Sequence, residues 1–319
     1  MNFSRARLLC FSALFVLSGA AWGSVDNVGT YNLILKNDLS TSSDIEGRIM
    51  IGGNINGSST DVGSRIPLDA DVDAVTVVGD INAPSLKAQN GHIVYGGNAN
   101  TNNIITNSST GQIIKEDQSL LQTRFDEIFQ SVIDDSYYYK NLAANGTFNT
   151  SDQNKKLFDS DATDELLVFN IDGDDLRYGG LEFNFMPSVP IIINVAGTGE
   201  LNINAKAQGN YFNKDTVSPL VLWNFYDYTK LSFNGDGWNG SVLAPYADIS
   251  SYTGSLDGGI AALSYTGGVE IHNKLFTFEP NTAGPKDEEI PVPEPSTWLI
   301  FAGGFWLLFR QYKLNSARN

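Results

Sequence analysis

Short β-type runs that end in Gly, Asn or Asp constrain the fold of this chain more than any other feature. Three of them are Gly47–Asn54 (GRIMIGGN), Val75–Asp80 (VTVVGD) and Gly91–Asn98 (GHIVYGGN). Their last residues are 26 and 18 residues apart. Similar units at such a spacing predict rungs of a solenoid, in which each short strand buries its apolar face on the next. A β-sandwich with Gly-rich hairpins is the alternative, and the uneven spacing excludes a strict repeat.

The second half of the chain carries further strand-like runs, separated by Gly, Asn, Asp or Ser. Several are apolar at every position, as strands buried on both faces of a stacked parallel sheet require. The runs are Glu165–Ile171, Val189–Val195, Leu201–Asn204, Val221–Phe225, Lys230–Phe233, Gly240–Ile249, Gly258–Leu263 and Gly268–His272.

One helix is expected between these two sets of strands. An apolar stripe at helical spacing consists of Leu121, Phe125, Ile128, Phe129 and Val132. Ser119 and Gln122 have the spacing of a capping box, and Asn145-Gly146 is a stop signal. A helix that binds a partner would have the same pattern. Core packing is the commoner cause, so we expect this helix to lie along the side of the solenoid.

The strand-rich region resembles a known family. The resemblance rests on Ser43–Ile49 (SDIEGRI), Leu222–Phe225 (LWNF), Leu243–Pro245 (LAP) and Glu270–His272 (EIH). These motifs are similar to those of the choice-of-anchor A domain, over most of residues 29–278. The resemblance implies an exported bacterial protein with an adhesive module. The last strands also resemble the final coils of bacterial ice-binding domains, which implies a right-handed parallel β-solenoid with one long flanking α-helix.

The N-terminus has the pattern of a secretory signal. Arg5 and Arg7 precede an apolar stretch, and small residues follow at Ala21 and Gly23, which predicts cleavage before Ser24. A retained N-terminal anchor is the alternative. The only cysteine, Cys10, lies inside this segment. The mature chain would therefore have no thiol, which excludes disulfides, cysteine metal ligands and cysteine nucleophiles.

The C-terminus combines a proline-stiffened motif, an apolar run and a basic end. Two prolines hold the motif extended between the folded region and the run. The run is short for a bilayer span but approaches the required length of about 20 residues when its flanks are counted. The alternative is a buried terminal helix or strand. The motif is Val292, Pro293, Glu294, Pro295 and Ser296, and the expected membrane anchor is Trp298, Leu299, Ile300, Phe301, Phe305, Trp306, Leu307, Leu308, Phe309, Arg310 and Lys313.

This tail resembles a PEP-CTERM sorting signal of Gram-negative bacteria. The resemblance implies that an exosortase, an integral-membrane processing enzyme, recognises the motif and cuts the chain from its anchor. The expected route is a precursor held transiently in the inner membrane, then a protein at the cell surface or outside the cell. The expected organisation is a signal peptide (1–23), a β-solenoid domain (24–280), a linker with the Pro-Glu-Pro motif (281–295) and a transmembrane sorting tail (296–319).

Charge argues against nucleic acid as a partner. The chain has 319 residues and a net charge of −16. The two terminal segments hold five of its 20 basic residues and no acidic ones, which leaves 15 basic against 36 acidic side chains between them. So acidic a chain repels nucleic acid and anionic membranes. It suits an exported soluble domain.

Candidate sites are few. Glu270 and His272 are two residues apart on an expected strand, so they point to one face and could act as a general base or as metal ligands. A structural pair is the commoner arrangement, and no nucleophile-elbow motif lies near them. The Asp-rich stretches Asp69–Asp73 and Asp172–Asp175 suit calcium but lack EF-hand spacing, and such loops are usually only solvated. No catalytic or cofactor-binding residue is assigned.

Aromatic residues cluster in two places. Exposed aromatic rings would offer platforms for sugars or partners, whereas alternating strand positions would bury about half of them in the core. The threonines, such as Thr101, Thr106 and Thr110, are too irregular for the flat array that ice binding calls for. The aromatic clusters are Tyr137, Tyr138 and Tyr139, and then Trp223, Phe225, Tyr226, Tyr228 and Trp238.

Three functions follow as hypotheses. The first is a non-enzymatic surface or matrix protein that adheres to polysaccharide or to cell surfaces. The second is a polysaccharide-acting enzyme on a β-helix, which would depend on Glu270 and His272. The third is a passive coat or biofilm component.

Overall fold

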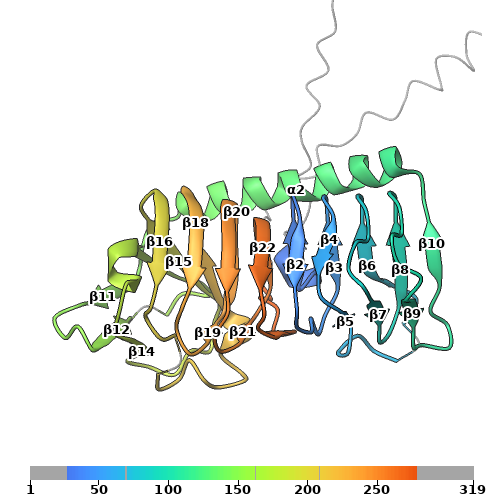
Figure 1. The fold of residues 1–319 in the computed structure, drawn as a ribbon. Helices are drawn as coiled ribbons and strands as arrows, with labels where there is room; N and C mark the ends of the chain where they lie inside the picture. Colours follow the sequence, from blue (N-terminus) through green and yellow to red (C-terminus); the bar gives the residue numbers. More distant parts are fainter. Residues whose placement is uncertain (1–26, 69, 162, 208, 279–319) are drawn as a thin grey trace, which may run out of the picture. The chain divides into compact units, whose positions relative to one another are not determined.

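Short parallel strands stacked side by side build the structure (Figure 1). The computed structural model describes residues 27–278, apart from Asp69, Ala162 and Gln208. In the N-terminal half, each coil of the chain adds one strand to each of up to three faces. The first face receives β1 (Leu33–Leu35), β3 (Ile49–Ile51), β6 (Asp73–Val77), β8 (His92–Tyr95) and β10 (Ile113–Lys115); the second receives β2 (Leu39–Thr41) and β4 (Ile55–Gly57); the third receives β5 (Thr60–Val62), β7 (Leu86–Ala88) and β9 (Ile104–Thr106).

The C-terminal half repeats this plan from the other end. The long strands β20 (Ser241–Ser251) and β22 (Ile260–Gly267) bend at the corner, where their register shifts between Ala244 and Asp248 of β20, so each serves the first and the second face. The first face receives β13 (Leu167–Asp172), β15 (Ile191–Ala196), β17 (Val221–Asn224), β20 (Ser241–Ser251) and β22 (Ile260–Gly267); the second also receives β16 (Gly199–Ile203) and β18 (Tyr228–Phe233); the third receives β19 (Trp238–Asn239), β21 (Leu256–Asp257) and β23 (Ile271–His272).

Shorter elements complete the described region. A small separate sheet joins β11 (Thr147–Asn149), β12 (Lys155–Asp159) and β14 (Gly180–Phe183), in which β11 and β12 are antiparallel. The remaining short helices are α1 (Asn27–Thr30), η1 (Gly173–Leu176) and η2 (Ser218–Leu220).

The first and the last strands of the main sheet meet in its middle. Its order is β10-β8-β6-β3-β1-β22-β20-β17-β15-β13, so the chain winds outward from β1, returns through a helix, and winds back inward to β22. At this seam Leu33 lies in register with Ile49 on one side and with Ile260 on the other. In Figure 1 the blue strands of the N-terminal half lie beside the orange ones of the C-terminal half.

A parallel β-solenoid is therefore the correct alternative, and the β-sandwich is wrong. Every pairing within the main sheet of the described residues is parallel, whereas a sandwich is built from antiparallel strands. The uneven spacing of the first three rungs also has a cause. Ten residues, 63–72, separate β5 from β6, whereas only residues 89–91 connect β7 to β8.

Alternation along the strands separates two apolar cores. In β1, the side chains of Leu33 and Leu35 point into the solenoid, and Ile34 points to the opposite side. The outer core also contains Met50, Val94, Ile192, Leu222, Leu243 and Ala261, and the long helix covers it. The inner strands of the first face, such as β1 and β3, are apolar at every position because both of their faces are buried.

A ladder of polar side chains explains the Gly-Gly-Asn corners. The backbone N–H of Asn54 donates to Asp38 Oδ1, that of Asp80 donates to Asn54 Oδ1, and that of Asn98 donates to Asp80 Oδ1, at 2.7, 2.8 and 2.6 Å. Each oxygen lies against a glycine of the next rung. A Cβ atom on Gly97 would lie 2.3 Å from Asp80 Oδ1 and 2.5 Å from the backbone oxygen of Gly79, and the backbone cannot turn aside as a side chain could. Glycine is thus required here by close approach.

The predicted helix is α2 (Gln118–Lys140), and it lies along the first face of the solenoid as expected (Figure 1). Its 23 residues span about 34 Å at 1.5 Å per residue. Leu121, Phe125, Phe129 and Val132 are buried in the outer core, and Ile128 is partly buried.

The ends of α2 differ from the sequence prediction. Asp117, not Ser119, caps the N-terminus, because its carboxylate accepts from the backbone N–H groups of Ser119 and Leu120. The helix ends at Lys140, with Asn141 as its C-cap, before the Asn145-Gly146 signal. Asn145 instead binds the edge of β13, where its side chain accepts from the N–H of Val168 and donates to the carbonyl of Leu166.

Buried asparagines fix the C-terminal half of α2 to the sheet. Asn194 Nδ2 donates to the carbonyl of Tyr139 at 2.8 Å, and Asn224 Nδ2 donates to that of Ser136 at 2.9 Å. The Ser136 hydroxyl donates back to Asn224 Oδ1 at 2.6 Å. These bonds satisfy polar groups inside an apolar core, where an unpaired group would cost about 1–3 kcal/mol.

The terminal segments lie outside the described residues. The signal peptide, the sorting motif and the membrane anchor therefore stay predictions. Among the residues that are described, no helix has the length and apolar character needed to cross a membrane.

One carboxylate on α2 predicts an unusual pH dependence. Burial raises the pKa of Asp135 to about 7, and the charge of Asp134 adds to this. Because its pKa is raised on folding, Asp135 stabilises the fold below about pH 4, and this contribution is lost as the pH rises through about 7. We expect the Asp135→Asn variant to unfold at a higher temperature than the wild type at pH 8. Its free energy of unfolding should exceed that of the wild type by an amount on the order of 1–3 kcal/mol.

Thermal unfolding of the full chain between pH 4 and pH 8 measures this effect. Asp134→Asn is the matched control, because the neighbouring Asp134 is exposed and its charge is only the smaller cause of the shift. The control should keep most of the pH slope of the wild type. An Asp135→Asn chain with the wild-type slope would contradict the assignment.

Candidate functional site

The second face of the solenoid presents a straight row of small polar side chains. The registers place Ser232 beside Ser250, Ser250 beside Thr266, and Thr266 beside Ser40. Because every second residue of a strand points outward, each rung contributes one member, about 4.8 Å from the next. The row, here called the polar row, consists of Asn202, Ser232, Ser250, Thr266, Ser40, Asn56, Asn82 and Asn100.

Hydrogen bonds along the polar row hold it in place. The Ser250 hydroxyl donates to Ser232 Oγ at 3.1 Å. Farther along, Asn82 Nδ2 donates to Asn56 Oδ1 at 2.9 Å, and Asn100 Nδ2 donates to Asn82 Oδ1 at 2.6 Å. Such bonds between neighbouring rungs fix the side chains before a ligand arrives, which lowers the entropy cost of binding.

A second row, two residues earlier on each rung, carries charge. Its one lysine is Lys230, whose Nζ lies 3.4 Å from Glu200 Oε2. The acidic side chains of the row outnumber this lysine. The Ser264 hydroxyl donates to Asp248 Oδ1 at 2.5 Å. This charged row consists of Glu200, Lys230, Asp248, Ser264, Asp38, Asn54, Asp80 and Asn98.

Strand β20 crosses both rows, with one exposed tyrosine two residues before its charged-row member and another directly after its last residue. Along it Tyr246 and Asp248 are exposed and Ser250 is half-buried, while Ala247, Ile249 and Ser251 are buried. Tyr252 follows directly and is 67% exposed, against 45% for Tyr246. Tyr246, Asp248, Ser250 and Tyr252 are called the β20 stripe below.

Sequence reasoning missed this stripe. The sequence YADISSY from Tyr246 to Tyr252 alternates between polar or aromatic and apolar or small residues. That period of two is the usual signal of a half-buried strand and would have placed both tyrosines on the outside.

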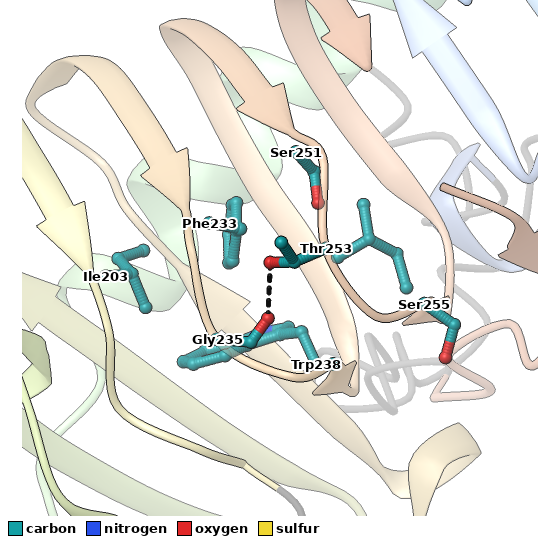
Figure 2. A pocket seen from close by; sticks show the side chains of 9 residues that line it. Ile203, Phe233, Gly235, Trp238, Ser251, Thr253 and Ser255 are labelled. Atoms are coloured by element: carbon teal, nitrogen blue, oxygen red, sulfur yellow. Dashed lines mark hydrogen bonds between the residues drawn. The ribbon is translucent and has the colours of Figure 1, made fainter. Parts of the chain in front are cut away.

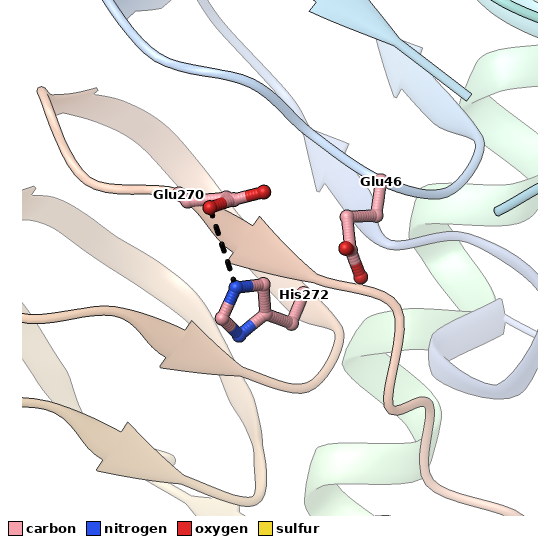
Figure 3. Close-up of side chains that lie close together, drawn as sticks. All are labelled: Glu46, Glu270 and His272. Carbon is pink, nitrogen blue, oxygen red and sulfur yellow. Dashed lines mark ion pairs between the residues drawn. The ribbon is translucent and has the colours of Figure 1, made fainter. Parts of the chain in front are cut away.

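The predicted pair Glu270 and His272 lies at the seam, on the third face (Figure 3). His272 Nε2 is 3.4 Å from Glu270 Oε2, and Nδ1 is 2.5 Å from Asp257 Oδ1. A third acid, Glu46, comes from the N-terminal half, and its ligand oxygen lies within 4.8 Å of the Glu270 and His272 ligand atoms. The structure therefore brings the predicted pair together and adds residues from two other segments.

Basic residues surround this cluster. Lys274 Nζ is 2.7 Å from Asp257 Oδ2 and 2.8 Å from Asp215 Oδ1. Arg65 Nε is 3.2 Å from Glu46 Oε1. Burial lowers the pKa of His272, but the hydrogen bond to Asp257 and the charges of Asp257, Glu46 and Glu270 outweigh burial, so the pKa lies above its ordinary value.

Comparison with known proteins identifies the domain. The family described as "Putative Ice-binding-like adhesive domain" matches residues 24–273. The chain belongs to this family. Its adhesive domain marks the protein as one that binds surfaces, and it supports a non-enzymatic role. The curated proteins compared with the chain contain no match.

Three solved structures are similar to the adhesive domain. An ice-binding protein from the Antarctic ascomycete Antarctomyces psychrotrophicus is 11% identical, with 79% of this chain and 98% of that chain covered and a TM-score of 0.31. An ice-binding protein from an Antarctic biological consortium is 13% identical, with 85% and 95% covered and a TM-score of 0.31. One from an Antarctic bacterium of the Flavobacteriaceae is 11% identical, with 78% and 80% covered and a TM-score of 0.27.

Most aromatic residues that the sequence singled out belong to the core of the adhesive domain. Trp223, Phe225, Tyr228 and Trp238 are buried, and Tyr226 is partly buried. Tyr139 is fully buried, whereas its neighbours Tyr137 and Tyr138 are exposed on α2. The core interpretation is therefore correct for the strand aromatics, and an exposed platform is not found there.

The Asp-rich stretches of the adhesive domain have separate partners. Asp71 Oδ1 is 2.8 Å from His92 Nε2, and the Asp73 carboxylate is 3.7 Å from Arg124. Asp172 caps η1, and Asp174 is 2.7 Å from Arg177 Nε. Burial raises the pKa of the third acid of that stretch, Asp175. Calcium at these positions stays a prediction without support from their geometry.

Two hollows in the described part of the adhesive domain bear on the candidate sites. The first hollow, between β18 and β20, is lined by Phe233, Trp238 and Ser251 and leaves no room for a water molecule. At its edge Thr253 Oγ1 donates to the Gly235 carbonyl at 2.7 Å (Figure 2). The second hollow has a volume of about 250 Å³, and its lining includes Arg65 and Asn273, which lie beside the cluster of Glu46, Glu270 and His272. Neither of these two hollows is lined by Glu270 or His272.

Proposed function

We propose that the chain is an exported adhesive protein that binds polysaccharide through the second face of its solenoid. The observation that carries this proposal is the β20 stripe, in which two exposed tyrosines flank the polar and charged rows. Tyrosine rings stack on the apolar faces of sugar rings and add a hydroxyl for hydrogen bonding. The polar row supplies donors and acceptors at a constant spacing, as a repeating polymer requires.

The charge of the face favours a neutral polysaccharide. Acidic side chains outnumber Lys230 in the charged row, and the whole chain carries −16. An acidic polymer would be repelled by this field, whereas a neutral one is not affected by it. The polar row contains one threonine, Thr266, so the proposal does not extend to ice. A passive coat component is the remaining alternative and would show no affinity for glycans.

Substitutions in the β20 stripe test the binding face. We expect Tyr246→Ala and Tyr252→Ala each to weaken binding of the full chain to an insoluble neutral glucan by about 2–10-fold, because each removes one stacking platform. Co-sedimentation across a range of glucan concentrations gives the apparent Kd. Tyr137→Ala, which removes an exposed tyrosine from α2, should leave the Kd unchanged.

Equal losses in all three variants would contradict the assignment of the face. No binding of the wild type to neutral, acidic or amino-sugar polysaccharides would contradict adhesion to glycans and leave the coat component. Binding that is tighter to the acidic polymer would contradict the charge argument.

We also propose that the domain is a choice-of-anchor A domain sorted by a PEP-CTERM signal. The support is the ordered tail, in which Pro293 and Pro295 precede an apolar run and a basic end. On this proposal an exosortase removes the anchor after the chain has reached the inner membrane of a Gram-negative cell. The released protein then acts at the cell surface or outside the cell.

Mass spectrometry of the mature protein tests the processing. We expect the surface-located or released chain to begin at Ser24 and to lack Arg318, because cleavage removes both terminal segments. The chain from the membrane fraction of a strain without the exosortase should keep Arg318. A released wild-type chain that still carries Arg318 would contradict the proposal.

A further inference from the structure

The third face of the solenoid carries a second cluster of chemistry, which adhesion does not use. We propose that Glu46, Glu270 and His272 form a binding site for one divalent transition-metal ion, of which zinc fits best. The proposal is independent of the polysaccharide face, because none of the three residues belongs to the polar row, the charged row or the β20 stripe.

The distances suit a small tetrahedral ion. His272 Nε2 and Glu270 Oε2 are 3.4 Å apart. Two ligands at 2.0–2.1 Å from a tetrahedral zinc ion are about 3.3 Å from each other. One oxygen of Glu46 lies within 4.8 Å of a ligand atom of Glu270 and of His272, so a modest rotation of this carboxylate completes three protein ligands. Water would occupy the fourth position.

The second nitrogen of the imidazole is held as in known zinc sites. Asp257 Oδ1 is 2.5 Å from His272 Nδ1, and Lys274 fixes the other Asp257 oxygen at 2.7 Å. A carboxylate on one ring nitrogen fixes the tautomer, orients the ring and leaves the opposite nitrogen to coordinate metal. Asp257 is thus a positioning residue and touches no metal itself.

The charge of the cluster also fits a divalent cation. Four carboxylates, those of Glu46, Asp215, Asp257 and Glu270, face two cations, Arg65 and Lys274. With a neutral imidazole the cluster keeps two negative charges, which one divalent ion neutralises. The imidazole ligand selects zinc over calcium, because calcium prefers six to eight oxygen ligands.

The ion would join the two halves of the solenoid. Glu46 follows Ile45, which forms parallel bridges to Val62 and to Ile271. Glu270 and His272 lie in the last coil, immediately on either side of Ile271. Coordination therefore links the first coil to the last, and it stabilises the folded state because the unfolded chain does not hold these ligands together.

The site is open to solvent. The side chains of His272 and Glu270 are 28% and 47% exposed. The 70% exposed Arg65, which now contacts Glu46, has room to move away when the ion binds. The hollow of about 250 Å³ lined by Arg65 and Asn273 lies next to the cluster, because Arg65 and the backbone N–H of Asn273 both contact Glu46.

Calorimetric titration of the chelator-treated full chain with zinc chloride at pH 8 tests the site. We expect one zinc ion bound, a higher unfolding temperature in its presence, and no comparable response to calcium. Glu270→Gln and His272→Asn should each weaken zinc binding at least about tenfold by removing a ligand. Asp257→Asn should weaken it about 10–100-fold while keeping the ligands.

The other histidine provides the matched control. His92 also pairs with a carboxylate, that of Asp71, but it lies outside the seam, so His92→Gln should bind zinc as the wild type does. Zinc binding should weaken on acidification, because a proton and the zinc ion compete for His272 Nε2. The charged groups around His272 are Asp257, Glu46, Glu270, Asp215, Lys274 and Arg65.

Three results would overturn the proposal. The first is no zinc binding tighter than about 1 mM at pH 8, which would leave the cluster as ion pairs only. The second is wild-type affinity in both Glu270→Gln and His272→Asn; because Glu270 is exposed, its variant is expected to fold and keeps the test decisive. The third is calcium binding as tight as zinc binding.

Discussion

The pairing of β1 with β22 is the interaction on which the rest of the structure depends. Each half of the solenoid is a stack of short strands, and strands of three residues hold together only through neighbours on both sides. Strand β1 is the neighbour of β22, with Leu33–Leu35 in register with Ile260–Ala262. This pairing joins the two stacks into one sheet. Helix α2 makes this closure possible, because it carries the chain from β10 back to the far end of the sheet and covers the outer core on the way.

The same closure produces both surfaces to which we assign a ligand, the polar row on the second face and the acidic cluster on the third. The polar row is continuous only because Ser40 of the N-terminal half lies in register with Thr266 of the C-terminal half. On the third face, the bridge between Ile45 and Ile271 brings Glu46 to Glu270 and His272. A ligand on the second face and an ion on the third would both span the seam. Each would therefore stabilise the closed solenoid, since both halves must be in place to bind it.

Local patterns in the sequence predicted the solenoid and the flanking helix, and long-range pairing escaped them. The Gly-Gly-Asn corners indicate rungs because the oxygen of one rung needs a glycine on the next. The stripe from Leu121 to Val132 indicates the helix for an equally local reason. The position of β22 beside β1 has no local signal, because any apolar strand of similar length could pair there. Glu270 and His272 could be paired from their spacing, whereas Glu46 and Asp257 join them only through contacts between distant segments. The exposed Tyr246 and Tyr252 were predictable from alternation alone.

A disulfide across the seam tests the closure of the solenoid most directly. Ser40→Cys and Thr266→Cys, in a chain with Cys10→Ser, would place two thiols on neighbouring strands about 4.8 Å apart, within the range that a disulfide spans. Ser40→Cys with Ser250→Cys is the matched pair, because Ser250 lies one strand farther along the row, at about 9.5 Å. Peptide mapping after mild oxidation should find the crosslink in the first pair and not in the second. A crosslink in the second pair alone, or in neither, would contradict the pairing of the first and last strands.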